Sequence, residues 1–170
     1  MASNNRIKAL FNSWGVSLYY LAEMKSGEET LRLYKESTEK FEAALKVEPD
    51  YEMALVSWAC CLLGLAEIGT GEEREKFINL AESKLLKAEE ISPGLGSYNL
   101  ACVAALRCDG LECKRWLENA DHFGTLQSVN HMKKDRDFDF VRHEKWFKEI
   151  LRTQRHKEII GYLKKHIFWL

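Results

Sequence analysis

The sequence contains very little proline and little glycine. Only two of its 170 residues are proline and ten are glycine. Proline ends helices because it has no backbone donor, and glycine favours turns, so their scarcity predicts long helices joined by few loops. A chain of this length can bury a core as one domain or as a short solenoid.

Long apolar runs are also missing. No stretch approaches the roughly 18 uninterrupted apolar residues of a membrane-spanning helix. The N-terminal residues show no apolar run followed by a small-residue cleavage site. These absences predict a soluble, intracellular (cytoplasmic) protein without membrane insertion.

The five cysteines form no CxxC pair, and no histidine stands at the spacing of a zinc finger. We expect them to be small residues of helix interfaces in a reducing compartment. Cys108 and Cys113 lie near a predicted turn and are expected to be the most accessible. The cysteine pattern therefore predicts no metal site.

Motifs of catalysis and cofactor binding are absent as well. The sequence contains no GxSxG, GxxxxGK(S/T), HExxH or GxGxxG. His122 and His131 could pair with a cysteine such as Cys113, but scattered histidines in helical repeats more often pack or face water. We expect a protein that is not an enzyme and that has no cofactor.

Charge is distributed unevenly along the chain, although its net value is only −1. Residues 23–90 hold 16 acidic and 9 basic residues, whereas residues 141–170 hold 3 acidic and 8 basic residues. Either part could attract a partner through its field, but such charges more often solvate helix faces.

The apolar residues recur at helical spacing up to Pro49 and again up to Pro93, a step of 44 residues. Proline marks a corner after each helix, so the step predicts stacked helical hairpins. In the first helix, residues 6–25, the expected apolar face consists of Ile7, Leu10, Phe11, Trp14, Leu18, Leu21 and Ala22. The residues that match at this step are Phe11 and Leu55, Trp14 and Trp58, Leu18 and Leu62, Leu21 and Leu65, Ala22 and Ala66, Lys40 and Lys84, Phe41 and Leu85, and Ala44 and Ala88.

A shorter third hairpin follows, with one helix from Tyr98 to Leu106 and a second from Cys113 to Ala120 around an Asp109-Gly110 turn. The polar stretch 131–142 is expected to be extended. A helix with Trp146 and Phe147 comes next, and a separate helical stretch is expected from Glu158 to Leu170.

These hairpins resemble the tetratricopeptide repeat family. The resemblance rests on Trp14-Gly15, Phe41, Ala44 and Pro49; on Trp58-Ala59, Ala81, Leu85, Ala88 and Pro93; and on Leu100-Ala101, Leu117 and Ala120. The family repeat has about 34 residues, so the first two repeats are lengthened here.

The resemblance implies an all-α fold, a right-handed superhelical stack of antiparallel helix hairpins with C-terminal capping helices. Residues 1–123 would hold three hairpins, at about 6–49, 50–93 and 94–123. Residues 124–170 would form a linker and the capping helices of the same structural unit, because a last repeat without a cap would expose an apolar face.

The resemblance also implies a binding surface, because the first helix of each hairpin lines the concave groove in this family. We therefore expect a non-catalytic scaffold or adaptor that binds a helical or extended apolar peptide segment. The residues expected in the groove are Asn12, Val16, Tyr19, Tyr20, Met53, Val56, Cys60, Leu63, Tyr98 and Cys102. With lengthened helices, some of them are expected to belong to the core instead.

One known partner class is not expected. Family members that bind the acidic tails of heat-shock chaperones use a carboxylate clamp of lysines, asparagines and an arginine. The matching positions here are Asn12, Val16, Ser57, Leu95 and Asn99, which provide no cation for a carboxylate.

Three alternatives remain open at the level of the sequence. The chain is similar in size to small tetratricopeptide chaperones that hold secreted substrates. The apolar end Ile167-Phe168-Trp169-Leu170 could support homo-oligomers by covering a neighbouring copy, or could fold into its own groove. The basic tail could meet an anionic membrane surface or nucleic acid, although a cap with a basic outer face is the favoured interpretation, so no nucleic-acid partner is expected.

Overall fold

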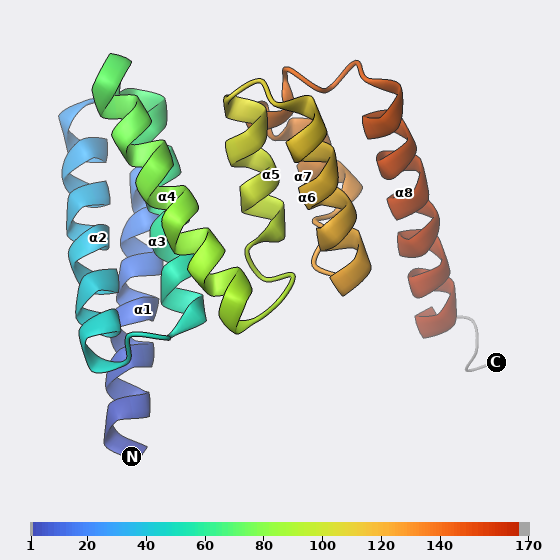
Figure 1. Ribbon diagram of the computed structural model, residues 1–170. Helices are drawn as coiled ribbons and strands as arrows, with labels where there is room; N and C mark the ends of the chain where they lie inside the picture. The colour runs from blue at the N-terminus through green and yellow to red at the C-terminus, as the bar shows by residue number, and fades with distance from the viewer. Residues whose placement is uncertain (1, 167–170) are drawn as a thin grey trace. The chain divides into compact units, whose positions relative to one another are not determined.

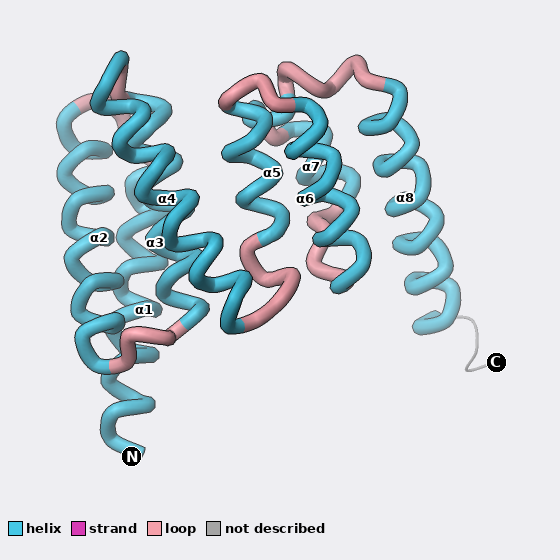
Figure 2. Tube along the Cα trace, viewed as in Figure 1, coloured by secondary structure: helices cyan, strands magenta, loops and turns pink. Residues whose placement is uncertain are grey.

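The computed structural model describes residues 2–166, and these residues form helices and loops without a strand (Figure 1). The prediction of an all-α protein is confirmed. Short loops join most of the helices (Figure 2). The helices are α1 (Ala2–Glu23), α2 (Glu28–Val47), α3 (Glu52–Ile68), α4 (Gly71–Ile91), α5 (Ser97–Leu106), α6 (Gly110–Phe123), α7 (Val129–Lys134), the 3-10 helix η1 (Arg136–Phe138) and α8 (Lys145–His166).

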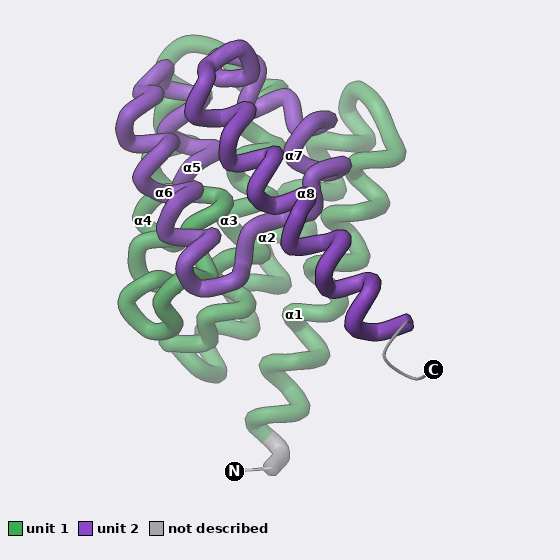
Figure 3. The backbone as a smooth tube through the Cα atoms, turned by 90° about the vertical axis from the view of Figure 1, so that its right-hand side faces the viewer, with its two compact units in different colours: residues 1–99 green, residues 100–170 purple. Residues whose placement is uncertain are grey.

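The chain divides into two compact units, residues 1–99 and residues 100–170 (Figure 3). The first unit contains α1 to α4 and the start of α5. The second contains the remainder of α5 together with α6, α7, η1 and α8. The division lies inside the predicted third hairpin, residues 94–123.

In the first unit, α1 packs along α2 and α3 packs along α4 as two antiparallel hairpins (Figure 1). Helix α2 also packs against α3, and α1 contacts α3. The corner between the hairpins contains Pro49, as predicted, and α2 ends immediately before it at Val47.

The same side-chain contacts occur in both hairpins. The Lys40 ammonium lies 4.5 Å from the centroid of the Trp14 ring, and the Lys84 ammonium lies 4.3 Å from that of Trp58. These pairs are separated by the step of 44 residues that the sequence shows. The repeat is therefore present in the packing as well as in the sequence.

The turns and corners repeat in the same way. Thr30 Oγ1 donates to the carbonyl of Ala22 at 3.4 Å, and Arg74 Nη1 donates to that of Ala66 at 2.9 Å. At the ends of α2 and α4, the backbone N–H groups of Glu48 and Ser92 donate to the carbonyls four residues earlier. In each turn, a side chain at the matching position thus donates to a carbonyl in the last turn of the preceding helix.

At one packing contact the two hairpins use different pairs of side chains, and the larger residue of each pair offsets the size of the smaller one. A Cβ atom on Gly15 would lie 2.6 Å from Cε1 of Phe41, which is fully buried. The second hairpin has Ala59 and Leu85 at these positions, both fully buried. The smaller leucine leaves room for the alanine methyl group.

The expected apolar face of the first helix is only partly buried. Ala22 is buried, but Leu10 is 66% exposed and Trp14 51% exposed. The matching Ala54 and Trp58 of α3 are buried because α2 packs against that helix. Among the described residues, no helix packs on the corresponding face of α1 in the way that α2 packs on α3.

The second unit buries apolar residues from four of its helical segments. Leu117 of α6, Met132 of α7, Phe138 of η1 and Phe147 of α8 are fully buried. The rings of Phe138 and Phe147 lie 5.3 Å apart between centroids. These residues place η1 and the start of α8 in one core with α6 and α7.

The predicted extended stretch 131–142 is wrong, because much of it is helical. Ser128 caps α7 by accepting from the His131 N–H, and Asp135 caps η1 by accepting from the Asp137 N–H. Met132, Phe138 and Val141 are fully buried. Short capped turns therefore bring these apolar residues into the core despite the polar residues around them.

Two separate helices were also expected after residue 142, but α8 runs without a break from Lys145 to His166. Nothing between Arg155 and Glu158 ends a helix, since these residues include neither proline nor glycine. The predicted positions 167–170 lie outside the described residues.

Candidate peptide-binding face

The predicted groove residues of α1 and α3 lie on two helices that pack against each other. Tyr20 is 63% exposed and Met53 is 46% exposed. The remaining accessible members are half-buried, namely Val16, Tyr19, Val56 and Cys60. We call these six residues the α1/α3 face.

Four of the predicted groove residues are buried. Leu63 is 8% exposed, Tyr98 is 6% exposed and Cys102 is 2% exposed. Asn12 is 9% exposed. Leu63, Tyr98 and Cys102 thus belong to the core, and Cys102 lies in the second unit.

Tyr19 lies at the centre of the aromatic part of the face. Its ring centroid is 5.3 Å from that of Tyr20 and 6.1 Å from that of Tyr34. Burial raises the pKa of Tyr19, and the nearby Cys60 of α3 raises it further. The Tyr19 hydroxyl therefore keeps its proton further into alkali than an ordinary tyrosine does.

Glu23 is the acidic residue beside the three tyrosine rings, and a hydrogen bond from Tyr34 fixes its side chain. Tyr34 donates its hydroxyl proton to the Glu23 carboxylate. Burial raises the pKa of Tyr34, and this hydrogen bond raises it too. The Glu23 carboxylate and the Tyr34 hydroxyl thus form a polar edge beside the aromatic part of the α1/α3 face.

Asn12 contributes an unsatisfied acceptor. Its Oδ1 atom is buried and has no hydrogen-bond donor among the described residues. A buried carbonyl oxygen without a donor costs about 1–3 kcal/mol.

Cys60 connects the face to the start of α5. Its thiol lies 3.8 Å from Asn99 Oδ1 and can donate a weak hydrogen bond to it. Asn99 also belongs to the first unit. The neutral amide gives this end of the face a polar group without charge.

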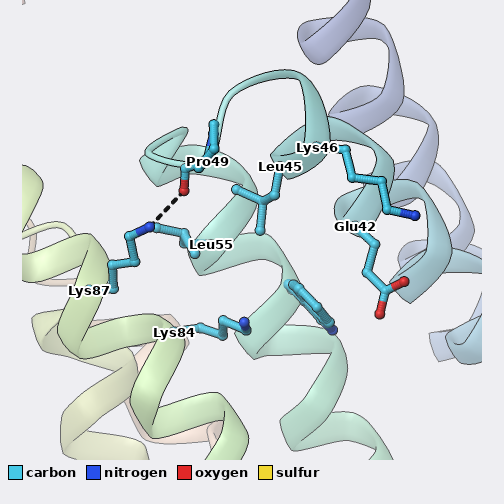
Figure 4. A pocket seen from close by; sticks show the side chains of 8 residues that line it. Glu42, Leu45, Lys46, Pro49, Leu55, Lys84 and Lys87 are labelled. Atoms are coloured by element: carbon cyan, nitrogen blue, oxygen red, sulfur yellow. Dashed lines mark hydrogen bonds between the residues drawn. The ribbon is translucent and has the colours of Figure 1, made fainter.

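A separate pocket of about 290 Å³ lies at the Pro49 corner (Figure 4). It contains none of the ten predicted groove residues. Lys87 donates to the Pro49 carbonyl at 2.9 Å and pairs with Asp50 at 2.7 Å, so this lysine braces the corner. The pocket is lined by Glu42, Leu45, Lys46, Pro49, Leu55, Trp58, Lys84 and Lys87.

One group in the second unit has the donor types of a metal site. The ligand atoms of Cys102, Asp135 and Asp137 lie within 4.8 Å of one another. Asp135 Oδ1 accepts from the Asp137 N–H at 3.1 Å, and its Oδ2 lies 3.9 Å from the Cys102 thiol. A metal ion would compete with these contacts, which already hold the η1 turn.

His131 approaches the same carboxylate, with Nε2 at 3.8 Å from Asp135 Oδ2. In a catalytic Cys–His–acid arrangement, the histidine stands between the nucleophile and the acid. Here the Cys102 thiol and the His131 imidazole both approach the same oxygen, Asp135 Oδ2. The carboxylate is thus the group that the two side chains share.

The cysteine predictions are correct in part. Cys61, Cys102 and Cys113 are buried and Cys108 is exposed. The expectation that Cys113 would be accessible is wrong, because it faces the core from α6 and is fully buried. Burial raises its pKa to about 12.

A second feature that the groove prediction missed is a basic pocket between α7 and α8. It is lined by Val129, Lys133, Lys148, Leu151, Arg152 and Arg155. The excess of basic residues in the C-terminal part of the sequence was its only signal.

Comparison of the chain with protein-family models, with curated proteins and with solved structures gives no match. Within residues 2–166, every helix is too short or too polar to cross a lipid bilayer. Conclusions about function therefore rest on the geometry of the described residues.

Proposed function

We propose that this protein is a non-catalytic interaction module of the tetratricopeptide type, which binds an apolar or helical peptide segment on the α1/α3 face. The exposure of Tyr20 and Met53 on the two packed helices, with Tyr20 against the half-buried Tyr19 ring, is the observation that carries this proposal. Aromatic side chains and methionine are common anchors of protein interfaces because they bury a large area.

The proposed hairpin type is supported by the repeated contacts of the first unit. The Trp14–Lys40 and Trp58–Lys84 pairs support the view that both hairpins follow one design. The resemblance to the family further implies that these hairpins stack as a right-handed superhelix.

The chemistry of the face favours a peptide over a charged small ligand. Its six residues include no Asp, Glu, Lys, Arg or His side chain. An amphipathic helix or an extended apolar segment could bury its side chains there.

A selection experiment tests the proposal. Peptides selected from a random library on the intact chain should compete with one another for one site. Their affinity should fall about tenfold or more in the double variant Tyr20→Ser with Met53→Ser, because both anchors are removed.

Leu80→Ser with Leu86→Ser is the matched control, since these α4 side chains are 40% and 42% exposed. This control should bind the peptides like the unaltered chain. An equal loss in both double variants, or in the control alone, would contradict the assignment of the face.

A further inference from the structure

The last turns of α8 expose apolar side chains. Ile159 is 47% exposed, Tyr162 is 63% exposed and Leu163 is 40% exposed. All side chains from Arg155 to His166 are exposed. This half of the helix therefore has an apolar surface that no described residue covers.

The helix is nevertheless anchored to its own unit. Glu158 accepts a hydrogen bond from the Val129 N–H at 2.8 Å. Lys157 pairs with Asp121 of α6 at 2.5 Å. Gln154 Nε2 lies 3.4 Å from the Leu126 carbonyl. These contacts tie the middle of α8 to α6, to the start of α7 and to the loop between them.

The basic pocket lies just before these turns. It has a volume of about 270 Å³, and Lys133, Lys148, Arg152 and Arg155 surround Val129 and Leu151. No acidic side chain lines it. Four cations around a small apolar floor are suited to a phosphate group.

Two of the four cations, Lys133 and Arg155, are available. The other two are engaged: Arg152 pairs with Glu149, and Lys148 donates to the His143 carbonyl. Lys133 and Arg155 make no side-chain hydrogen bond or ion pair within residues 2–166. Their charges are therefore free to meet an anion.

The pocket and the apolar turns share one side of α8. The pocket residues of α8 are spaced by one, three or four positions, namely Lys148, Leu151, Arg152 and Arg155. Ile159 lies four residues after Arg155, and Tyr162 and Leu163 continue the series. Residues at this spacing lie on one helical face.

We propose that this face of α8 docks the protein on a membrane surface that contains anionic phospholipids. The pocket receives a lipid phosphate, and Ile159, Tyr162 and Leu163 lie at the boundary between headgroups and acyl chains. Helix α8 contains seven basic and two acidic residues, so its charge complements an anionic surface. The helix lies on the membrane and does not cross it.

Exposed isoleucine and leucine favour lipid over nucleic acid. A nucleic-acid groove needs cations and aromatic stacking, and aliphatic side chains gain little there. A membrane interface uses both parts of this face, since apolar burial and cation attraction add to the affinity.

Co-sedimentation of the intact chain with vesicles tests the proposal. Vesicles with about one third phosphatidylserine should bind the chain, and vesicles of phosphatidylcholine alone should bind it much more weakly. Binding should weaken as salt is raised, because salt screens the cations.

Two double variants separate the contributions. Lys133→Gln with Arg155→Gln should lower vesicle affinity by roughly 30-fold, given the usual contribution of each cation near an anionic membrane. Ile159→Ser with Leu163→Ser should remove the binding that remains at high salt. Unchanged helical circular dichroism shows that each variant is folded.

The matched controls should bind vesicles like the unaltered chain. Lys35→Gln with Lys76→Gln removes two exposed cations of the first unit. Leu111→Ser removes an apolar side chain that is 85% exposed on α6. An equal loss in these controls would overturn the proposal.

Three other outcomes would also overturn it. These are equal binding to both kinds of vesicle, binding of a single-stranded oligonucleotide but not of vesicles, and a dimer that forms through Ile159 and Leu163 without vesicle binding. Peptide binding on the α1/α3 face is measured separately, so failure of one proposal leaves the other intact.

Discussion

At the scale of single residues, Gly15 is where an added methyl group should matter most. Its Cβ would meet the buried Phe41 ring at 2.6 Å. Overpacking costs about 1–3 kcal/mol, which exceeds the roughly 1 kcal/mol gained by alanine in a helix. Gly15→Ala should therefore lower the free energy of unfolding by about 1 kcal/mol in urea titrations.

The variant Phe41→Leu tests whether the contact with the Phe41 ring causes this loss of stability. The second hairpin combines alanine with leucine at these positions, so Gly15→Ala with Phe41→Leu should be more stable than the sum of the single effects predicts. Gly161→Ala is the control, because its Cβ would meet nothing within 4 Å. Additive single effects would show that the contact with Phe41 is not responsible.

Thiol accessibility is a second prediction at this scale. Cys108 is exposed, and its φ of 59° places it in the left-handed region at the end of α5. Cys113 is fully buried, and its pKa of about 12 leaves roughly one thiolate in ten thousand at pH 8. A thiol reagent should therefore modify Cys108 first, and peptide mapping should find Cys113 unmodified until the chain unfolds.

The same pKa predicts a loss of stability in alkali. The folded Cys113 thiol keeps its proton up to about pH 12, whereas the unfolded thiol loses it near its ordinary value of 9.0. The unfolded state then binds fewer protons, so the free energy of unfolding falls as pH rises through this window. Tyr19 and Tyr34 act in the same direction because their pKa values are also raised. A urea midpoint that stays constant or rises from about pH 8 to about pH 11 would contradict this.

At the scale of helices, the two lysine–tryptophan pairs allow a matched comparison. Trp58 is 9% exposed and Trp14 is 51% exposed. A cation over an aromatic ring contributes about 0.5–1 kcal/mol at exposed sites and about 2 kcal/mol when desolvated. Lys84→Met should thus destabilise the chain more than Lys40→Met in urea titrations, and equal losses would mean that burial does not strengthen the pair.

Much of the first unit could be predicted from the sequence because its repeat is direct. The step of 44 residues matched Trp14 with Trp58 and Lys40 with Lys84, and both pairs form contacts. Periodicity cannot say which face a neighbouring helix covers. For that reason Leu63 and Tyr98 were assigned to the groove although they are buried, and Leu10 was assigned to the apolar face although it is exposed.

The second unit was harder to predict. Helix α7 depends on a Ser128 cap and on Met132, two isolated signals within a polar stretch. The basic pocket combines Lys133 of α7 with Arg155 of α8, which are far apart in the sequence. Only tertiary packing brings such residues together, so charge counting could indicate a basic tail but not a site.

At the scale of the whole molecule, the two units should respond differently to a local change. Each unit has its own dense set of contacts, and such units often open separately. Gly15→Ala should therefore speed amide hydrogen exchange in α1 to α4 more than in α6 to α8. Equal acceleration throughout residues 2–166 would indicate a single cooperative unit.

The central claim is that the α1/α3 face binds a peptide, and the methionine methyl groups report on it directly. Met53 lies on the face and is 46% exposed, whereas Met132 is fully buried in the second unit. In a chain with 13C-labelled methionine methyl groups, a selected peptide should shift the Met53 resonance and leave that of Met132 unchanged. A peptide that binds and shifts Met132 while Met53 stays unchanged would contradict the account.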